Sequence, residues 1–128
     1  MDRSKEIYND WILSAEEDLL VTETLLKYSP KLVSAIAFHA EQAAEKMIKA
    51  YLIKLNIKLI KTHDFDKLLA LIEDREEFSA SLYELVVVFD KFNVEIRYPD
   101  SESIPNKEEL LEMIECAKKI YSFFKKLF

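Results

Sequence analysis

The sequence predicts an all-α domain, folded as an antiparallel up-and-down bundle of about five helices. Its 128 residues suit a single domain over residues 1–128, because typical domains contain about 100–150 residues. Apolar residues recur at steps of three and four along five separate stretches, which is the period of an α-helix. Short connections join these stretches and favour antiparallel neighbours.

The first two predicted helices carry long apolar stripes. The first covers roughly residues 3–27, and Ser29-Pro30 then resembles an N-cap followed by proline at the first position of a second helix. This second helix should run to about Asn56, an amino acid that tolerates the left-handed stop in a chain without glycine. Its broad apolar arc predicts a central helix, or one that also contacts a partner subunit. The arc comprises Leu32, Ile36, Ala40, Ala43, Met47 and Ala50.

Three further helices complete the predicted bundle. Thr62 or Asp64 should cap a short third helix that ends near Glu76. A fourth helix should cover roughly residues 78–95, where the longer apolar pattern outweighs a strand-like run of three valines. Asn106, with Glu109 three positions later, resembles a capping box at the start of the last helix. The apolar stripe of that helix comprises Leu110, Ile114, Ala117, Tyr121, Phe124 and Phe128.

Composition excludes several classes of protein. A hydrophobic content of 50% is too high for a disordered chain, and a charged content of 33% is too high for a membrane protein. The longest apolar run, residues 85–89, is far shorter than the ~20 residues that cross a bilayer, and no apolar leader follows Met1. Cys116 is the only cysteine, so a reducing compartment fits best. We expect a cytoplasmic protein that does not attach to membranes.

Composition also excludes several kinds of site. Phosphate loops of the Walker or Rossmann type need glycine, which lets the backbone approach phosphate closely and which this chain lacks. The net charge of -6 disfavours broad binding to duplex DNA but is compatible with a local basic pocket. Two histidines and one cysteine without ligand spacing predict no metal site, and we expect no cofactor.

A polar stripe runs along the second predicted helix, at the edge of its apolar arc. His39, Gln42, Lys46 and Lys49 follow one another at steps of three, four and three residues. One hypothesis is that the stripe binds a phosphate, a base or the corresponding stripe of a second subunit. The alternative is an ordinary amphipathic boundary with solvated lysines and one half-buried histidine, and periodicity alone favours this alternative.

A second candidate site is the segment Arg97-Tyr98-Pro99-Asp100, which places one of only three arginines beside a proline. Proline disfavours a helical conformation in the residue before it, so we expect a loop. The guanidinium of Arg97 can hold a phosphate through two parallel hydrogen bonds, and the ring of Tyr98 can stack on a base. In the structural alternative, Arg97 pairs with Asp100 or with a helix C-terminus. The sequence weighs these two hypotheses evenly.

His63 is the second histidine of the chain and lies beside Asp64. Its imidazole can act as an acid or a base near neutral pH. A structural role is the more usual one at the start of a helix, where side chains cap the backbone.

Three separate motifs follow one another along the chain. They are His39-Ala40-Glu41-Gln42-Ala43-Ala44-Glu45-Lys46 with Lys49-Ala50, then Thr62-His63-Asp64, then Arg97-Tyr98-Pro99-Asp100. In order and spacing they resemble the small prokaryotic HEPN proteins. Trp11, Ala15, Asp18 and Leu19 fit as well, so the resemblance spans nearly the whole chain.

The resemblance implies a bundle of five helices that usually forms a homodimer. It also implies a gene that often lies beside one for a minimal nucleotidyltransferase, in toxin–antitoxin-like pairs. Many HEPN proteins are metal-independent RNases, in which an arginine holds phosphate and a histidine separated from it by four to six residues assists proton transfer. Here the arginine would be Arg97, and the histidine window falls on Glu102, Ser103 and Ile104.

The missing histidine makes a binding role the leading hypothesis, because acid–base catalysis needs a group that titrates near neutrality. The protein would bind a nucleotide, an RNA or a nucleotidyltransferase partner. The alternative is a metal-independent endoribonuclease in which Arg97 works with a displaced His39 or His63. A third hypothesis is a purely structural helical interaction protein. The candidate binding residues are His39, Gln42, Lys46, Lys49, Arg97, Tyr98 and Asp100.

Overall fold

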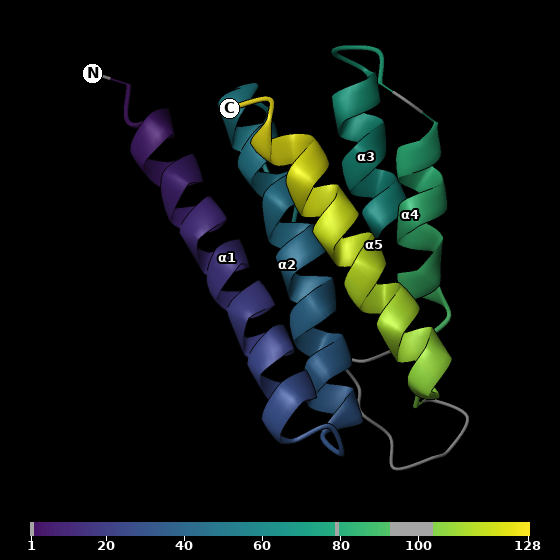
Figure 1. Ribbon diagram of the computed structural model, residues 1–128. Coiled ribbons are helices and arrows are strands. Elements are labelled where there is room, and N and C mark those ends of the chain that lie inside the picture. Colours follow the sequence, from purple (N-terminus) through teal and green to yellow (C-terminus); the bar gives the residue numbers. More distant parts are fainter. Residues whose placement is uncertain (1, 79, 93–103) are drawn as a thin grey trace.

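The computed structural model describes residues 2–78, 80–92 and 104–128 (Figure 1). Within these ranges the chain forms five helices. No strand occurs within these ranges. The predicted all-α bundle of five helices is confirmed, and no helix within the same ranges is long and apolar enough to span a bilayer. The helices are α1 (Ser4–Tyr28), α2 (Val33–Lys54), α3 (Phe65–Glu73), α4 (Ser81–Asp90) and α5 (Lys107–Lys125).

α2 lies at the centre of the bundle, in contact with α1, α3 and α5. Its buried side is rich in alanine, and Ala37, Ala40 and Ala44 are fully buried. These small side chains let the neighbouring helices approach closely, because the distance between packed helices depends on the residues at the contact. Met47 and Leu52 fill the space between them. The prediction of a central helix is confirmed.

α2, α3 and α5 point the same way, whereas α1 and α4 run opposite to them (Figure 1). The C-terminal ends of α2 and α5 are in contact: the ring centres of Tyr51 and Phe124 are 5.4 Å apart. His63, just before α3, contacts Glu45 in the middle of α2. Glu76, just after α3, accepts a hydrogen bond from Tyr51 near the end of α2. The connection between α2 and α3 therefore returns along α2, and these two consecutive helices are parallel. The predicted up-and-down order does not hold for this pair.

The predicted start of the second helix is wrong, because α2 begins at Val33 and not at Ser29-Pro30. The Ser29 N–H donates to the Leu25 carbonyl over 2.7 Å, so this serine ends α1. The Leu32 N–H donates to the Ser29 carbonyl over 3.0 Å and closes a turn between the two helices. Leu32, expected on the apolar arc, therefore precedes the helix and is 50% exposed.

The predicted left-handed stop at Asn56 is confirmed, with φ of 59°. The Asn56 N–H donates to the Ile53 carbonyl and the Ile57 N–H donates to the Leu52 carbonyl, at 3.0 and 2.9 Å. This pair of bonds is the Schellman motif, which satisfies carbonyl groups at the end of a helix. Glycine usually occupies the left-handed position, and asparagine is the common substitute.

Asp64 is the N-cap of α3, one of the two residues predicted for that role. Its Oδ1 accepts from the N–H groups of Asp66 and Lys67 at 3.0 and 3.3 Å. α3 ends at Glu73, before the predicted end near Glu76. α4 lies inside the range predicted for the fourth helix, and residues 93–95 of that range lie outside the described residues.

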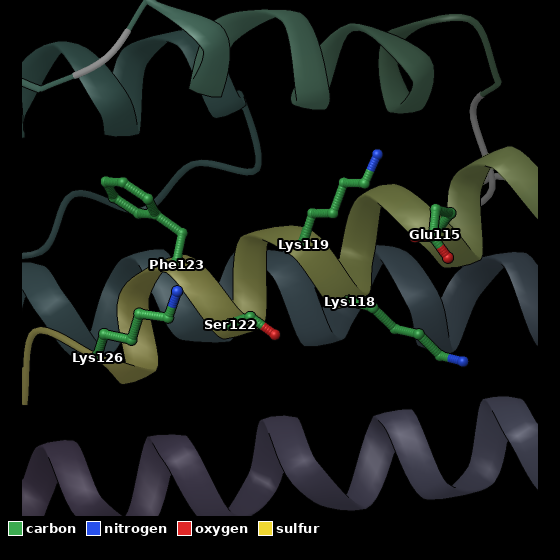
Figure 2. A pocket seen from close by; sticks show the side chains of 6 residues that line it. All are labelled: Glu115, Lys118, Lys119, Ser122, Phe123 and Lys126. Carbon is green, nitrogen blue, oxygen red and sulfur yellow. The ribbon is translucent and has the colours of Figure 1, made fainter.

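α5 buries most of its predicted apolar stripe and exposes the opposite face (Figure 2). Tyr121 is only half-buried, and its hydroxyl donates to the Glu16 carboxylate on α1. Burial and this carboxylate raise the pKa of Tyr121 to about 12. Cys116 is also half-buried, and burial raises the pKa of its thiol. The protonated and unreactive thiol therefore predominates at neutral pH.

The predicted capping box at the start of α5 is present. Asn106 Oδ1 accepts from the Glu109 N–H at 2.8 Å, and Glu109 Oε1 accepts from the Asn106 N–H at 2.9 Å. Lys91 Nζ, next to the end of α4, donates to the same carboxylate at 2.5 Å. The Asn106 backbone and the Lys91 ammonium lower the pKa of Glu109. One carboxylate thus joins α4 to the first turn of α5.

Replacing Asn106 with alanine should lower the free energy of unfolding by about 1 kcal/mol, because the first turn of α5 loses a backbone partner. Urea denaturation followed by circular dichroism would measure the change. Asn106→Ser keeps an acceptor and should stay within about 0.5 kcal/mol of the wild type.

The stability of the protein should also depend on pH through Glu109, because folding lowers the pKa of this carboxyl. The stabilisation by ionised Glu109 is complete above the pKa of the unfolded state and is lost as the pH falls through the pKa of the folded state.

Candidate functional site

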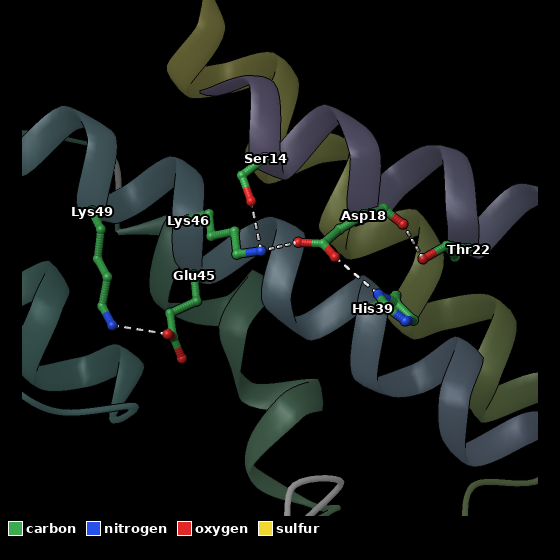
Figure 3. A network of polar contacts seen from close by, with 7 residues as sticks. All are labelled: Ser14, Asp18, Thr22, His39, Glu45, Lys46 and Lys49. Atoms are coloured by element: carbon green, nitrogen blue, oxygen red, sulfur yellow. Dashed lines mark hydrogen bonds and ion pairs between the residues drawn. The ribbon is translucent and has the colours of Figure 1, made fainter. Parts of the chain in front are cut away.

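The polar stripe of α2 contacts a buried carboxylate of α1 (Figure 3). Asp18 is 7% exposed, and its Oδ1 lies 2.9 Å from His39 Nδ1. Lys46 Nζ donates to Asp18 Oδ2 at 2.7 Å and to Ser14 Oγ at 2.8 Å. These four residues, the Asp18 cluster, join the middle of α1 to α2. Ser14 on α1 contacts Lys46, whereas Asp18, further along α1, also contacts His39, which comes earlier on α2. The two helices are therefore antiparallel.

A second carboxylate, Glu45, accepts from the other end of the stripe. Glu45 is 2% exposed, and Lys49 Nζ donates to its Oε2 at 2.9 Å. His63 Nδ1 lies 2.9 Å from Oε1 of the same side chain. These three residues form the Glu45 cluster. It fixes the segment before α3 against the middle of α2.

The two clusters have the same composition at their centres: one buried carboxylate, one lysine ammonium and the Nδ1 atom of one histidine. A buried carboxylate needs partners of this kind, because an unpaired charge costs several kcal/mol to desolvate. In the tautomer that carries a proton on Nδ1, each histidine donates to its carboxylate. The side chain of His39 is 29% exposed and that of His63 is 59% exposed.

The expectation of solvated lysines is wrong. The Lys46 side chain is 23% exposed and that of Lys49 is 11% exposed, and both ammonium groups are paired. The pairing has a chemical consequence, because a carboxylate already balances each of these cations. The stripe therefore has less positive charge to offer a phosphate than its sequence suggests. Gln42 is half-buried on the same stripe and takes part in neither cluster.

A groove of about 300 Å³ opens beside the Asp18 cluster, between α1 and α2. Asp10, Trp11, Ser14 and Lys46 line it. The Lys49 ammonium lies 5.8 Å from the centre of the Trp11 ring, within the range of a cation–π contact. Trp11 thus connects the two clusters. The groove combines an aromatic face, the Lys46 ammonium and the acceptor oxygens of Asp10, and the Lys49 ammonium lies against the Trp11 ring.

Sequence reasoning identified the stripe but missed Ser14, Asp18 and Glu45 as its partners. Signals for the two carboxylates were present. Asp18 lies between Ala15 and Thr22 on the buried face of α1, and Glu45 lies among buried residues of α2. An acidic residue inside an apolar stripe is almost never fully buried without a partner. The pattern therefore indicates two buried ion pairs. Spacing within α2 also indicates Lys49 as the partner of Glu45, but no spacing identifies the partner of Asp18.

Three of the predicted site residues, Arg97, Tyr98 and Asp100, lie outside the described residues, so their placement stays a prediction. α4 ends and α5 begins at the end of the bundle where α2 begins (Figure 1). Within the ranges that are described, no three His, Cys, Asp or Glu side chains gather as ligands for a metal ion.

Comparisons with known proteins identify one family. A model of the HEPN domain matches residues 8–127. The crystal structure of ST0689, an archaeal HEPN homologue, superposes with a TM-score of 0.72 and shares 23% sequence identity. The match covers 99% of this chain and 98% of that one, and at this identity it shows the fold alone. A comparison with curated proteins finds no match.

Proposed function

The chain belongs to the HEPN domain family, and from that premise we propose that it is a binding module for a nucleotide or a partner protein. The observation that carries the proposal is the groove between α1 and α2. Trp11 and Lys46 line this groove, and the Lys49 ammonium lies 5.8 Å from the Trp11 ring centre. An aromatic face can stack on a planar base, and ammonium groups beside it can contact a phosphate.

We expect the groove to bind a nucleotide with moderate affinity, because Lys46 and Lys49 are already paired with carboxylates. Asp18 and Glu45 already balance the charges of Lys46 and Lys49, so the groove attracts a phosphate less than two free lysines would. We propose that Arg97 and Tyr98 supply the missing contacts. The family resemblance supports this, because it implies that the arginine corresponding to Arg97 holds a phosphate.

We also propose a homodimer that acts with a minimal nucleotidyltransferase in a toxin–antitoxin-like pair in the cytoplasm. Two observations support surfaces for contact with a protein. Phe38 and Gln42 on α2 are only half-buried. Leu13 and Leu20 are 62% and 65% exposed and lie seven residues apart on one face of α1. Exposed apolar residues that gather on one face mark sites of protein contact. Light scattering that gives only the 15.1 kDa monomer would contradict the dimer.

Titration with ATP should quench the fluorescence of Trp11, which is the only tryptophan in the chain. Stacking of a base on the indole changes its surroundings directly, so the signal reports the groove itself. Calorimetry gives the affinity independently of fluorescence. Trp11→Leu keeps apolar volume but removes the aromatic face, and it should weaken ATP binding at least about fivefold, the lower end of what one stacked base contributes.

Two controls make this test specific. Trp11→Phe keeps an aromatic ring and should bind ATP nearly as well as the wild type. Tyr28→Leu removes a ring that is 72% exposed at the far end of α1 and should change nothing. If calorimetry detects neither ATP nor a purified minimal nucleotidyltransferase, the binding-module proposal is wrong.

A second candidate function is metal-independent RNA cleavage, and one contact favours it. Asp18 orients His39 through Nδ1, as a carboxylate orients the imidazole of a general base. The partly exposed ring would then use Nε2 to accept a proton. His63 has the same relation to Glu45. In this candidate Arg97 would hold the phosphate.

A further inference from the structure

Positive charge is concentrated at the C-terminal end of the chain. Residues 116–128 contain four lysines and no aspartate or glutamate, whereas the whole chain has a net charge of -6. The lysines are Lys118, Lys119, Lys125 and Lys126. All four are exposed, on the second half of α5 or directly after it. A strongly basic surface thus occurs on an acidic protein.

A shallow groove of about 290 Å³ follows this surface. Its lining residues all come from one face of α5 and the residue after it, at helical spacing. Figure 2 shows Lys118 on one side of the helix, and Lys119 with the Phe123 ring on the other. Phe123 is half-buried, and its ring meets Phe124 edge to face at 5.1 Å. The lining residues are Glu115, Lys118, Lys119, Ser122, Phe123 and Lys126.

The dipole of α5 does not explain these lysines. A helix dipole favours cations only in the last turn, and Lys125 is the basic residue of that turn. Ion pairs between described residues involve only two of them and are exposed: Lys125 Nζ lies 3.7 Å from the Glu16 carboxylate. Lys118 Nζ lies 2.8 Å from Glu23, but the two side chains are 45% and 54% exposed, and such surface pairs contribute little. Lys119 and Lys126 form no ion pair with any described residue.

We propose that this face of α5 binds single-stranded nucleic acid. A basic groove with a partly exposed aromatic ring is the usual way to bind a single strand, since lysines contact the phosphates and the ring stacks on a base. Lys119 and Lys126 are seven residues apart, or about 10 Å along the helix axis, so they can contact different phosphates of one strand. This site is separate from the groove between α1 and α2 and does not depend on the function proposed for that groove.

The test measures fluorescence anisotropy of a labelled 12-residue oligouridine in EDTA, over a series of salt concentrations. Lys119→Glu with Lys126→Glu should weaken binding at least tenfold. The salt dependence should also fall, because each lost phosphate contact on a single strand removes about 0.7 from the slope of log affinity against log salt. Lys58→Glu with Lys61→Glu makes the same charge change at two exposed lysines before α3 and should have a much smaller effect.

Phe123→Leu separates stacking from charge. Leucine keeps apolar volume against the core but cannot stack, so oligouridine should bind about fivefold more weakly with an unchanged salt slope. Tyr28→Leu removes an exposed ring at the C-terminal end of α1 and should leave this binding intact. Equal losses from the two lysine pairs, or an equal loss in Tyr28→Leu, would overturn the assignment to α5. Binding of polyglutamate in place of oligouridine would also overturn it and would indicate an acidic protein partner.

Discussion

Replacing Asp18 with asparagine should destabilise the protein by about 2–3 kcal/mol. The change keeps the shape of the side chain and removes the charge that balances the Lys46 ammonium. Removal of one partner of a buried ion pair typically costs about 3–5 kcal/mol. We expect less than that, because the Lys46 side chain keeps 23% of its exposure and can reach water. Chemical denaturation at neutral pH would measure the loss as a lower midpoint with an unchanged slope.

Two comparisons separate the buried pair from the general effect of a lost charge. Glu17→Gln removes the same charge from the neighbouring exposed position of α1 and should change stability by no more than about 0.5 kcal/mol. The double variant Asp18→Leu with Lys46→Met removes both charges and should recover most of the stability. If Asp18→Asn and Glu17→Gln cost the same, the Asp18 cluster has no special role in stability.

The helices could be predicted from the sequence because their patterns are local. A repeat of apolar residues decides that a segment is helical, and a cap depends on residues only a few positions apart. Asn56, Asp64 and Asn106 were predicted for this reason. The prediction that Ser29 caps the second helix was wrong for a related reason, since a serine between two helices can end the first or begin the second. Here its N–H ends α1, and α2 begins without a side-chain cap.

The candidate site could be predicted only in part, because several of its contacts join residues of different helices. Helical spacing brought Lys46 and Lys49 to one edge of α2. The pairing of Lys46 depends on where α1 places Asp18, and no spacing within α2 contains that information. The pairing of Lys49 with Glu45, in contrast, is an i,i+4 contact within α2 that helical spacing could have indicated. The contact between His63 and Glu45 needs the connection between α2 and α3 to return along α2. Sequence alone suggested a direct antiparallel turn.

The same packing limits how the groove can be tested. Lys46 and Lys49 face a possible ligand and also balance buried carboxylates, so replacing them would alter stability and binding together. Trp11 and the exposed lysines of α5 do not have this double role. Variants at these positions therefore report binding more directly than variants of the stripe.

RNA cleavage by the purified protein in EDTA should be weak or absent. A correctly placed acid–base group contributes about 10²–10⁴-fold to the rate, and no histidine occurs in the window after Arg97. The described histidines belong to different clusters, each held by its own buried carboxylate. Binding needs only charge and geometry, so a chain without this group can still hold a nucleotide.

A gel assay with a fluorescent RNA, run beside a no-protein control, would measure the residual rate. Arg97→Ala should leave this rate unchanged if it is only background, and so should Arg75→Ala, which removes an exposed arginine after α3. The opposite result would be cleavage that survives EDTA and Arg75→Ala but is lost in Arg97→Ala and in His39→Gln or His63→Gln. A displaced histidine would then complete a catalytic site, because glutamine can replace the contact of Nδ1 with the carboxylate but cannot transfer the proton.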